Sequence, residues 1–217
     1  MKIPIIGKTL TFPNPENAYE GIVAIGGDLS PARLLTAYKN GIFPWFSEDE
    51  PIIWWCPDPR FVLFPKDLVV SKTMKKLFVK NTFEITTNSC FEKVINACAH
   101  QKRPEQDGTW ITDEMKEAYL QLHEMGYAHS VEVWQEKQLV GGIYGVIIGK
   151  AFFGESMFFK ISNASKYGFI WLVQHLHEKG FHFIDCQIET NHLKSLGANH
   201  IPRKDFLQLV KLAVDSD

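Results

Sequence analysis

The chain has 217 residues, of which 45% are hydrophobic and 13% aromatic, so it can bury the core of one large domain or two small ones. Its net charge of −2 excludes a uniformly basic nucleic-acid binder and leaves such binding to a local patch. No run of about 18 apolar residues is present, which predicts no membrane-spanning helix. Early prolines in MKIPIIGKTLTFPNP argue against a signal peptide. Four cysteines without a CxxC pair predict free thiols in a reducing cytoplasm and no metal site.

The first 60 residues predict one helix between irregular segments. Residues 1–29 read as an irregular entry segment. Ser30 and Pro31 then predict a helix that ends near Asn40. Residues 42–60, IFPWFSEDEPIIWWCPDPR, are dense in proline and tryptophan, which predicts neither a regular helix nor a central strand. Aromatic side chains on such a segment belong either to a core or to a ligand-stacking platform.

Residues 61–87 predict two short strands, with a helix capped by Ser71 between them. Spacings of three and four place several lysines on one face of that helix, and Arg60 and Lys66 precede it. Such a face is either simply solvated or a contact for phosphates. The lysines are Lys72, Lys75, Lys76 and Lys80.

Two amphipathic helices follow, at residues 89–100 and from the cap Thr112 to Met125. Trp110 stands just before the second helix, where it either closes the helix or meets a ligand. We expect a small N-terminal α/β domain at residues 1–86 and a larger domain at residues 87–217.

The stretch from 131 to 187 organises the larger domain. Three strand-like runs end at residue 159, a helix runs from Ser162 or Asn163 to Gly180, and FHFIDCQ returns as a strand. This order predicts an α+β fold with a mixed sheet, like an acyltransferase of the GNAT kind, in which the sheet splays open beside the helix. The start of the helix, SNASK, has no glycine-rich turn, which argues against a bound CoA pyrophosphate.

Polar residues interrupt these apolar strands. Glu155 lies within AFFGESMFF, and Asp185 and Gln187 are two apart in the return strand, so a regular strand places both on one face. Glu155 and Met157 are expected to share a face in the same way. Buried carboxylates are costly unless they are paired or used in chemistry. The pattern alone fits an ordinary core with satisfied carboxylates as well as an apolar slot with a polar floor.

Several motifs closely resemble the leucyl/phenylalanyl-tRNA–protein transferase family, among them GGDLSPARLLTAYKNGIFPWFS, PIIWWCPDPR, GTWIT, FFGESMF, NASK and IDCQ. The resemblance extends from Phe12 to about Phe206. It implies a small N-terminal domain joined to a GNAT-like catalytic domain, and an activity that needs no cofactor. It also implies transfer of Leu or Phe from Leu-tRNA or Phe-tRNA to proteins with an N-terminal Arg or Lys. That new N-terminus marks the acceptor for N-degron degradation in the cytoplasm, and the enzyme is expected to be a monomer.

The resemblance assigns roles to individual residues. The reaction centre maps onto Asp185, Gln187 and Glu155. Gln187 is expected to position the attacking amine and Asp185 to orient Gln187. Glu155 is expected to hold the ammonium of the transferred amino acid or the incoming basic residue. Trp45 and Trp110 match tryptophans that stack on the terminal adenosine, and the lysine helix matches a basic region for the acceptor stem. The amino-acid side-chain pocket maps onto Ile143, Met157, Phe169, Leu172, Leu176 and Ile184.

Two other readings remain at this point: a GNAT-type enzyme that uses acyl-CoA, and a tRNA-binding module without catalysis. Binding of acetyl-CoA would favour the first. Tight tRNA binding without transfer would favour the second.

Overall fold

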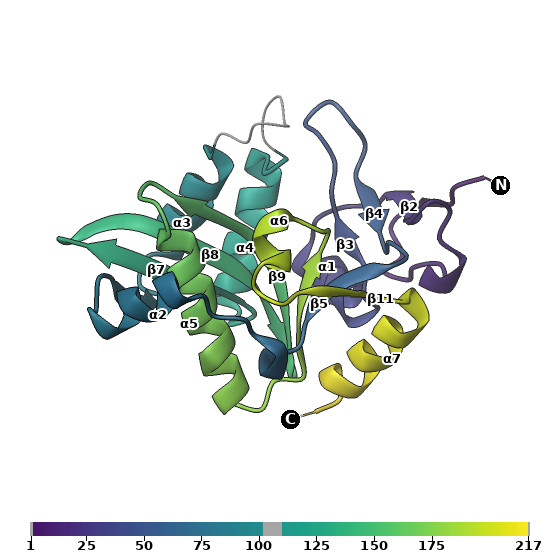
Figure 1. The fold of residues 1–217 in the computed structure, drawn as a ribbon. Coiled ribbons are helices and arrows are strands. Elements are labelled where there is room, and N and C mark those ends of the chain that lie inside the picture. Colours follow the sequence, from purple (N-terminus) through teal and green to yellow (C-terminus); the bar gives the residue numbers. More distant parts are fainter. Residues whose placement is uncertain (1, 102–109, 217) are drawn as a thin grey trace.

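The computed structural model describes residues 2–101 and 110–216. Figure 1 shows a long twisted sheet that crosses the molecule, with the N-terminal segment and α7 at one end of it. No helix within the described ranges is long and apolar enough to cross a bilayer.

A small four-stranded sheet forms near the N-terminus, with strand order β1-β2-β4-β3. Two predictions are wrong here, because β2 lies within the segment expected to be irregular and β4 is an inner strand. The indole of Trp54 on β4 is fully buried, and its Nε1 donates to the Gly26 carbonyl over 2.8 Å. The prolines flank β4 and do not interrupt it. The elements are β1 (Ile5–Ile6), β2 (Ile22–Gly26), α1 (Pro31–Lys39), β3 (Phe43–Pro44) and β4 (Ile53–Trp55).

The larger sheet has seven strands in the order β11-β5-β10-β9-β8-β7-β6. Strand β10 is parallel to β9 and antiparallel to β5, so the sheet is mixed, as predicted. The predicted order of antiparallel strands, crossover helix and return strand is confirmed. The strands are β5 (Arg60–Leu63), β6 (Glu84–Thr87), β7 (Ala128–Gln135), β8 (Gln138–Ile148), β9 (Ala151–Phe159), β10 (Phe183–Gln187) and β11 (Asn199–Ile201).

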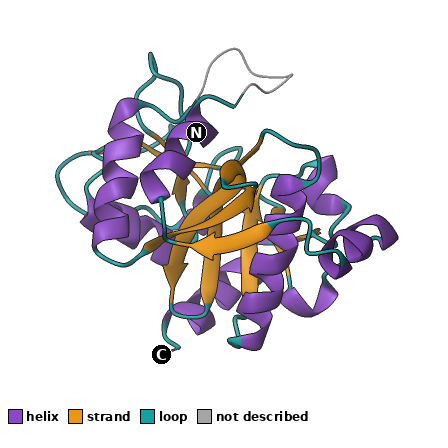
Figure 2. Cartoon of the chain, turned by 90° about the vertical axis from the view of Figure 1, so that its left-hand side faces the viewer, coloured by secondary structure: helices purple, strands orange, loops and turns teal. Residues whose placement is uncertain are grey.

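Helices cover both faces of this sheet (Figure 2). Neighbouring residues on a strand point to opposite faces, and on β9 Phe152 and Phe153 belong to two different hydrophobic clusters. One of them, the α5 cluster, includes residues of α5 and α2. The other includes residues of α1, α3, α4 and α7. The helices are α2 (Lys72–Val79), α3 (Phe91–Ala99), α4 (Asp113–Glu124), α5 (Ala164–Glu178), α6 (Asn191–Lys194) and α7 (Arg203–Val214).

Local sequence signals set the helix starts. The side chains of Ser71 and Thr112 accept hydrogen bonds from the backbone N–H groups of Met74 and Met115, as their capping roles predict. Helix α5 lies very close to the sheet, since a Cβ atom at Gly168 would stand 2.7 Å from the side chain of Val133. The helix that flanks the return strand is therefore held firmly against β7 and β8.

The domain boundary at residue 86 stays a prediction. Strand β5 precedes that point and β7 follows it, and both belong to the seven-stranded sheet.

Candidate active site

Two strand irregularities shape the gap between β9 and β10. These strands pair only from Ala151 to Phe153 on β9, and β9 then continues beside β8 alone. On β9, Gly154 pairs with Gly145 and Ser156 with Tyr144, so Glu155 is an extra residue in a bulge. On β10, the register shifts just before Gln187. Bulges re-aim side chains and are common beside active sites.

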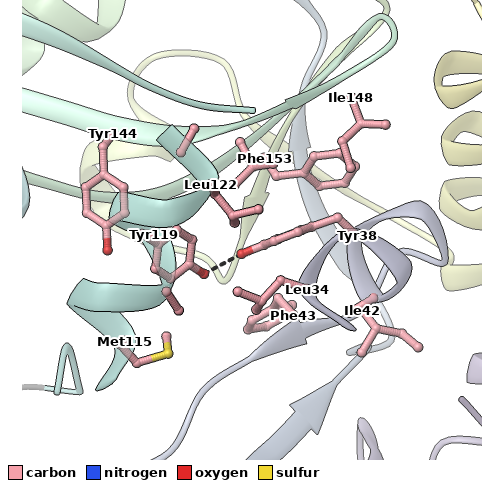
Figure 3. Close-up of a cluster of buried hydrophobic side chains, with 14 of the residues drawn as sticks. Leu34, Tyr38, Ile42, Phe43, Met115, Tyr119, Leu122, Tyr144, Ile148 and Phe153 are labelled. Carbon is pink, nitrogen blue, oxygen red and sulfur yellow. Dashed lines mark hydrogen bonds between the residues drawn. The ribbon is translucent and has the colours of Figure 1, made fainter. Parts of the chain in front are cut away.

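The Glu155 carboxylate accepts three hydrogen bonds, although the residue as a whole is half-buried. The hydroxyl of Tyr38 donates to Oε1 over 2.8 Å, and that of Tyr119 donates to Oε2 over 2.7 Å. The Nε2 of Gln187 also donates to Oε1, over 3.0 Å. The two tyrosine hydroxyls also contact each other, from helices α1 and α4 (Figure 3).

Burial gives this group unusual acid–base properties. Loss of hydration raises the pKa of Glu155 to about 7, although the hydrogen bonds from Tyr119, Tyr38 and Gln187 favour the ionised form. Burial likewise raises the pKa values of Tyr38 and Tyr119 well above the usual range, so both remain donors. Glu155 can therefore take up or release a proton near neutral pH.

Asp185 lies in a different environment. It is fully buried and forms a two-point ion pair with Arg60, in which Nε–Oδ1 is 2.8 Å and Nη2–Oδ2 is 2.6 Å. Burial alone would lower the pKa of Arg60, but the Asp185 carboxylate raises it above its usual value. Oδ1 of Asp185 also accepts from the backbone N–H of Gln187 over 3.0 Å.

These contacts correct the predicted shared faces. Asp185 and Gln187 contact different partners, because the bulge between them and the left-handed backbone of Gln187 (φ 61°) break the alternation. Met157 packs against the α5 cluster, whereas Glu155 contacts tyrosines of the opposite cluster. The three polar residues do lie together, but Asp185 contacts the backbone N–H of Gln187 and not its side chain.

The six residues assigned to the side-chain pocket lie together in the cluster between α5 and the sheet. Five of them are at most 5% exposed, and Met157 is half-buried. An amino-acid side chain can enter this cluster only if these residues move apart. The five are Ile143, Phe169, Leu172, Leu176 and Ile184.

Trp45 and Trp110 are both half-buried and pack against the same hydrophobic cluster. The segments that follow them line one cavity of about 310 Å³, which includes Phe46 and Thr112. Trp54 is fully buried, and Trp55 donates from Nε1 to the Trp45 carbonyl over 2.7 Å. Both indole N–H groups therefore have hydrogen-bond acceptors within the protein.

Helix α2 presents its lysines to solvent. Its opposite face packs on α5, where the rings of Phe78 and Tyr167 stack with centroids 3.9 Å apart. Val79, which interrupts the basic run, is 84% exposed. The exposed lysines are Lys72, Lys75, Lys76 and Lys80.

All four cysteines are free, as predicted. Within residues 2–101 and 110–216, no group of three or more His, Cys, Asp or Glu side chains is arranged to hold a metal ion.

Comparison with known proteins identifies the family. Residues 62–211 match the sequence model described as leucyl/phenylalanyl-tRNA protein transferase, and residues 27–58 match the model of its N-terminal domain. The chain belongs to the leucyl/phenylalanyl-tRNA–protein transferase family. It is therefore an aminoacyltransferase.

Individual members of the family are similar over nearly their whole length. The leucyl/phenylalanyl-tRNA–protein transferase of Syntrophus aciditrophicus is 54% identical over 212 residues, which cover 97% of this chain and 89% of that protein. That of Flavobacterium johnsoniae is 53% identical over 205 residues, which cover 94% and 97%. A GCN5-related N-acetyltransferase from Kribbella flavida is a far more distant structural neighbour, with a TM-score of 0.40 and 12% identity over 78% of this chain and 59% of that one.

Sequence reasoning missed three residues of this candidate site. The sequence pattern indicates no site role for Tyr38 or Tyr119. Arg60 was read as part of the basic run. A buried tyrosine hydroxyl needs a hydrogen-bond partner, which was the available signal for the tyrosines. No local pattern indicated that Arg60 would pair with Asp185.

Proposed function

We propose that this chain transfers Leu or Phe from the 3′ end of aminoacyl-tRNA to the N-terminal Arg or Lys of acceptor proteins in the cytoplasm. Family membership supports the donor and the reaction class. The observation that carries the chemistry is the contact between the Gln187 amide and the Glu155 carboxylate at the gap between β9 and β10.

The reaction is aminolysis of an ester, in which one proton must leave the attacking amine and one must reach the departing ribose oxygen. Glu155 is suited to both tasks because its pKa is about 7, close to the ordinary range of about 7.7–8.0 for an α-amine. The carboxylate takes the proton from the amine as the carbon–nitrogen bond forms. It returns that proton to the ribose oxygen as the ester bond breaks.

Gln187 positions the amine and does not act as the base, because a neutral amide is a very poor proton acceptor. Its Nε2 is directed to Glu155, so its Oε1 can accept a hydrogen bond from the attacking amine. That arrangement places the nitrogen beside the carboxylate that removes its proton.

The remaining contacts follow from the layout of the surface. The lysines of α2 contact phosphates of the acceptor stem, which gives little sequence selectivity. Trp45 and Trp110 stack on the terminal adenosine, with each stacked base worth about 1–3 kcal/mol. The leucyl or phenylalanyl side chain enters the α5 cluster where β9 and β10 separate.

Transfer of radiolabelled Leu from Leu-tRNA to a peptide that begins with Arg tests this function. A peptide of the same sequence that begins with Ala is the control, and acetyl-CoA is offered as an alternative donor. We expect label only on the Arg peptide and only from Leu-tRNA. Equal labelling of both peptides would exclude the proposed acceptor specificity, and no labelling with tRNA bound would favour a binding module.

A further inference from the structure

The ion pair between Arg60 and Asp185 joins two neighbouring strands at the edge of the site. Arg60 begins β5, Asp185 lies in β10, and neither side chain has any exposed surface. The guanidinium and the carboxylate meet at two points, 2.8 and 2.6 Å apart. A two-point contact fixes the orientation of both planar groups.

Two aromatic rings hold the guanidinium in place. The Cζ atom of Arg60 lies 4.6 Å from the centre of the Phe43 ring and 4.5 Å from that of Phe206. These rings come from β3 and α7. Lysine lacks the flat shape that fits between two rings and the fork that meets a carboxylate at two points.

The oriented carboxylate controls the backbone of Gln187. Oδ1 of Asp185 accepts from the Gln187 N–H over 3.0 Å, and Gln187 has a φ of 61°. Side chains other than glycine adopt this left-handed conformation rarely, and usually where the surroundings impose it. The turn is what directs the Gln187 amide away from the strand and toward Glu155.

Stability of the fold alone does not explain this ion pair. The Nη1 atom of Arg60 is buried and has no hydrogen-bond partner among the described residues. Apolar side chains of similar volume often replace a buried ion pair without loss of stability. A fully buried charge pair with an unsatisfied N–H therefore points to a task other than holding the fold together.

We propose that Arg60 is a positioning residue, which orients Asp185 so that its carboxylate holds the Gln187 backbone in the turn that aims the amide at Glu155. The inference rests on the proposed function. It makes Asp185 a positioning residue as well. Both carboxylate oxygens are occupied and the side chain is inaccessible, so Asp185 does not meet the substrate.

A rescue experiment separates positioning from direct chemistry. In Asp185→Asn, the amide NH₂ faces the guanidinium and Arg60 loses its counter-charge, so the turn at Gln187 is disturbed. Adding Arg60→Gln gives a neutral amide pair, in which the Asn oxygen can again accept from the Gln187 N–H. We expect kcat to fall about 100-fold in Asp185→Asn and to recover to within about tenfold of wild type in the double variant.

The double variant Arg33→Gln with Asp28→Asn is the matched control. Arg33 is also fully buried and paired with a carboxylate, over 3.0 Å, but it lies outside the site. We expect its kcat to equal that of wild type. If the Arg60→Gln, Asp185→Asn variant folds but stays as slow as Asp185→Asn, the carboxylate charge acts directly and the inference is wrong.

Two further measurements cover the remaining cases. Arg60→Lys, which can meet only one carboxylate oxygen, should lower kcat about tenfold with an unchanged KM for Leu-tRNA; an unchanged kcat would overturn the inference. Hydrogen exchange at the backbone N–H of Gln187 is a readout that does not depend on activity. It should be faster in Arg60→Met with Asp185→Leu than in wild type, and equal exchange would also overturn the inference. Absence of transfer by the wild-type chain would instead contradict the proposed function.

Discussion

The Nε2 atom of Gln187 donates to Oε1 of Glu155 over 3.0 Å, although their strands stop pairing before either residue is reached. Each of the two residues lies at a register shift of its own strand. The contact therefore joins β9 and β10 just beyond the point where the two strands stop pairing. In the proposed mechanism, the carboxylate and the amide therefore have a fixed relative position before substrate binds.

The proposed acid–base role of Glu155 predicts a pH profile. Transfer needs the ionised carboxylate, so kcat/KM should rise as the pH increases through about 7, the pKa of Glu155. Glu155→Gln should lose the inflection near 7, keep only that of the acceptor α-amine at about 7.7–8.0, and transfer about 10²–10³-fold more slowly. Single-turnover transfer between pH 5.5 and 8.5 measures both effects.

Gln187→Ala, which lacks the side-chain amide but keeps the carboxylate, is the control. It should be slow and keep the inflection near 7. An inflection near 7 that survives in Glu155→Gln would assign it to another group.

The tyrosine pair tunes that inflection. Tyr119 donates one of the three hydrogen bonds that favour the ionised form of Glu155. Removing it in Tyr119→Phe should raise the pKa of Glu155 further and move the activity profile to higher pH. Tyr167→Phe is the matched control, since Tyr167 stacks on Phe78 and does not contact Glu155. A profile that is the same in wild type and Tyr119→Phe would exclude this coupling.

The same pKa predicts how stability changes with pH. Glu155 has a folded-state pKa of about 7, above the ordinary 4.5, so between these values the folded state binds more protons than the unfolded state. The free energy of unfolding therefore falls as the pH rises through this window, by roughly 1–3 kcal/mol from this group. Glu155→Gln should lack that decrease, which urea unfolding at pH 4.5 and 8 measures. Glu178→Gln controls for the loss of a surface carboxylate, and parallel behaviour of the two variants would contradict the prediction.

Local patterns predicted the helices well, because caps and apolar periodicity lie within a few neighbouring residues. Thr112 and Ser71 cap the helices that they were expected to cap. The order of strands and helix around α5 was predicted for the same reason.

The geometry of the site could not be predicted in this way. The bulge at Glu155 depends on the register between β8 and β9, which no single strand encodes. Tyr38 and Tyr119 meet across 81 positions of sequence, and Arg60 reaches Asp185 across 125. Residue type indicated which polar groups were unusual, but their partners depended on tertiary packing.

The α5 cluster predicts substrate preference. Phe169 is 3% exposed within the proposed pocket, so Phe169→Ala should enlarge it and favour the larger phenylalanyl side chain over leucyl. One methylene of difference in an apolar pocket is worth about 1–3 kcal/mol, so removal of a phenyl ring should shift the preference by at least that much. Competition between Leu-tRNA and Phe-tRNA measures the ratio. His175→Ala, on the same helix but outside the six residues, should keep the wild-type ratio, and an unchanged ratio in Phe169→Ala would remove Phe169 from the pocket.

The exposed face of α2 predicts how tRNA binding responds to salt. Each lysine that contacts a phosphate releases counterions, so it steepens the dependence of affinity on salt. The double change Lys75→Gln and Lys76→Gln should weaken binding of Leu-tRNA and Phe-tRNA equally and reduce the slope of log K against log salt by about 1–2. Filter binding between 50 and 200 mM salt measures the slope, with the same tRNA used for the variant and for wild type. Lys179→Gln, an exposed lysine after α5, is the control and should leave it unchanged. The proposed contacts are to phosphates and not to the reacting ester, so the single-turnover rate at saturating tRNA should stay at the wild-type value. A lower rate would place α2 in the chemistry, and an unchanged slope would show that this face is only solvated.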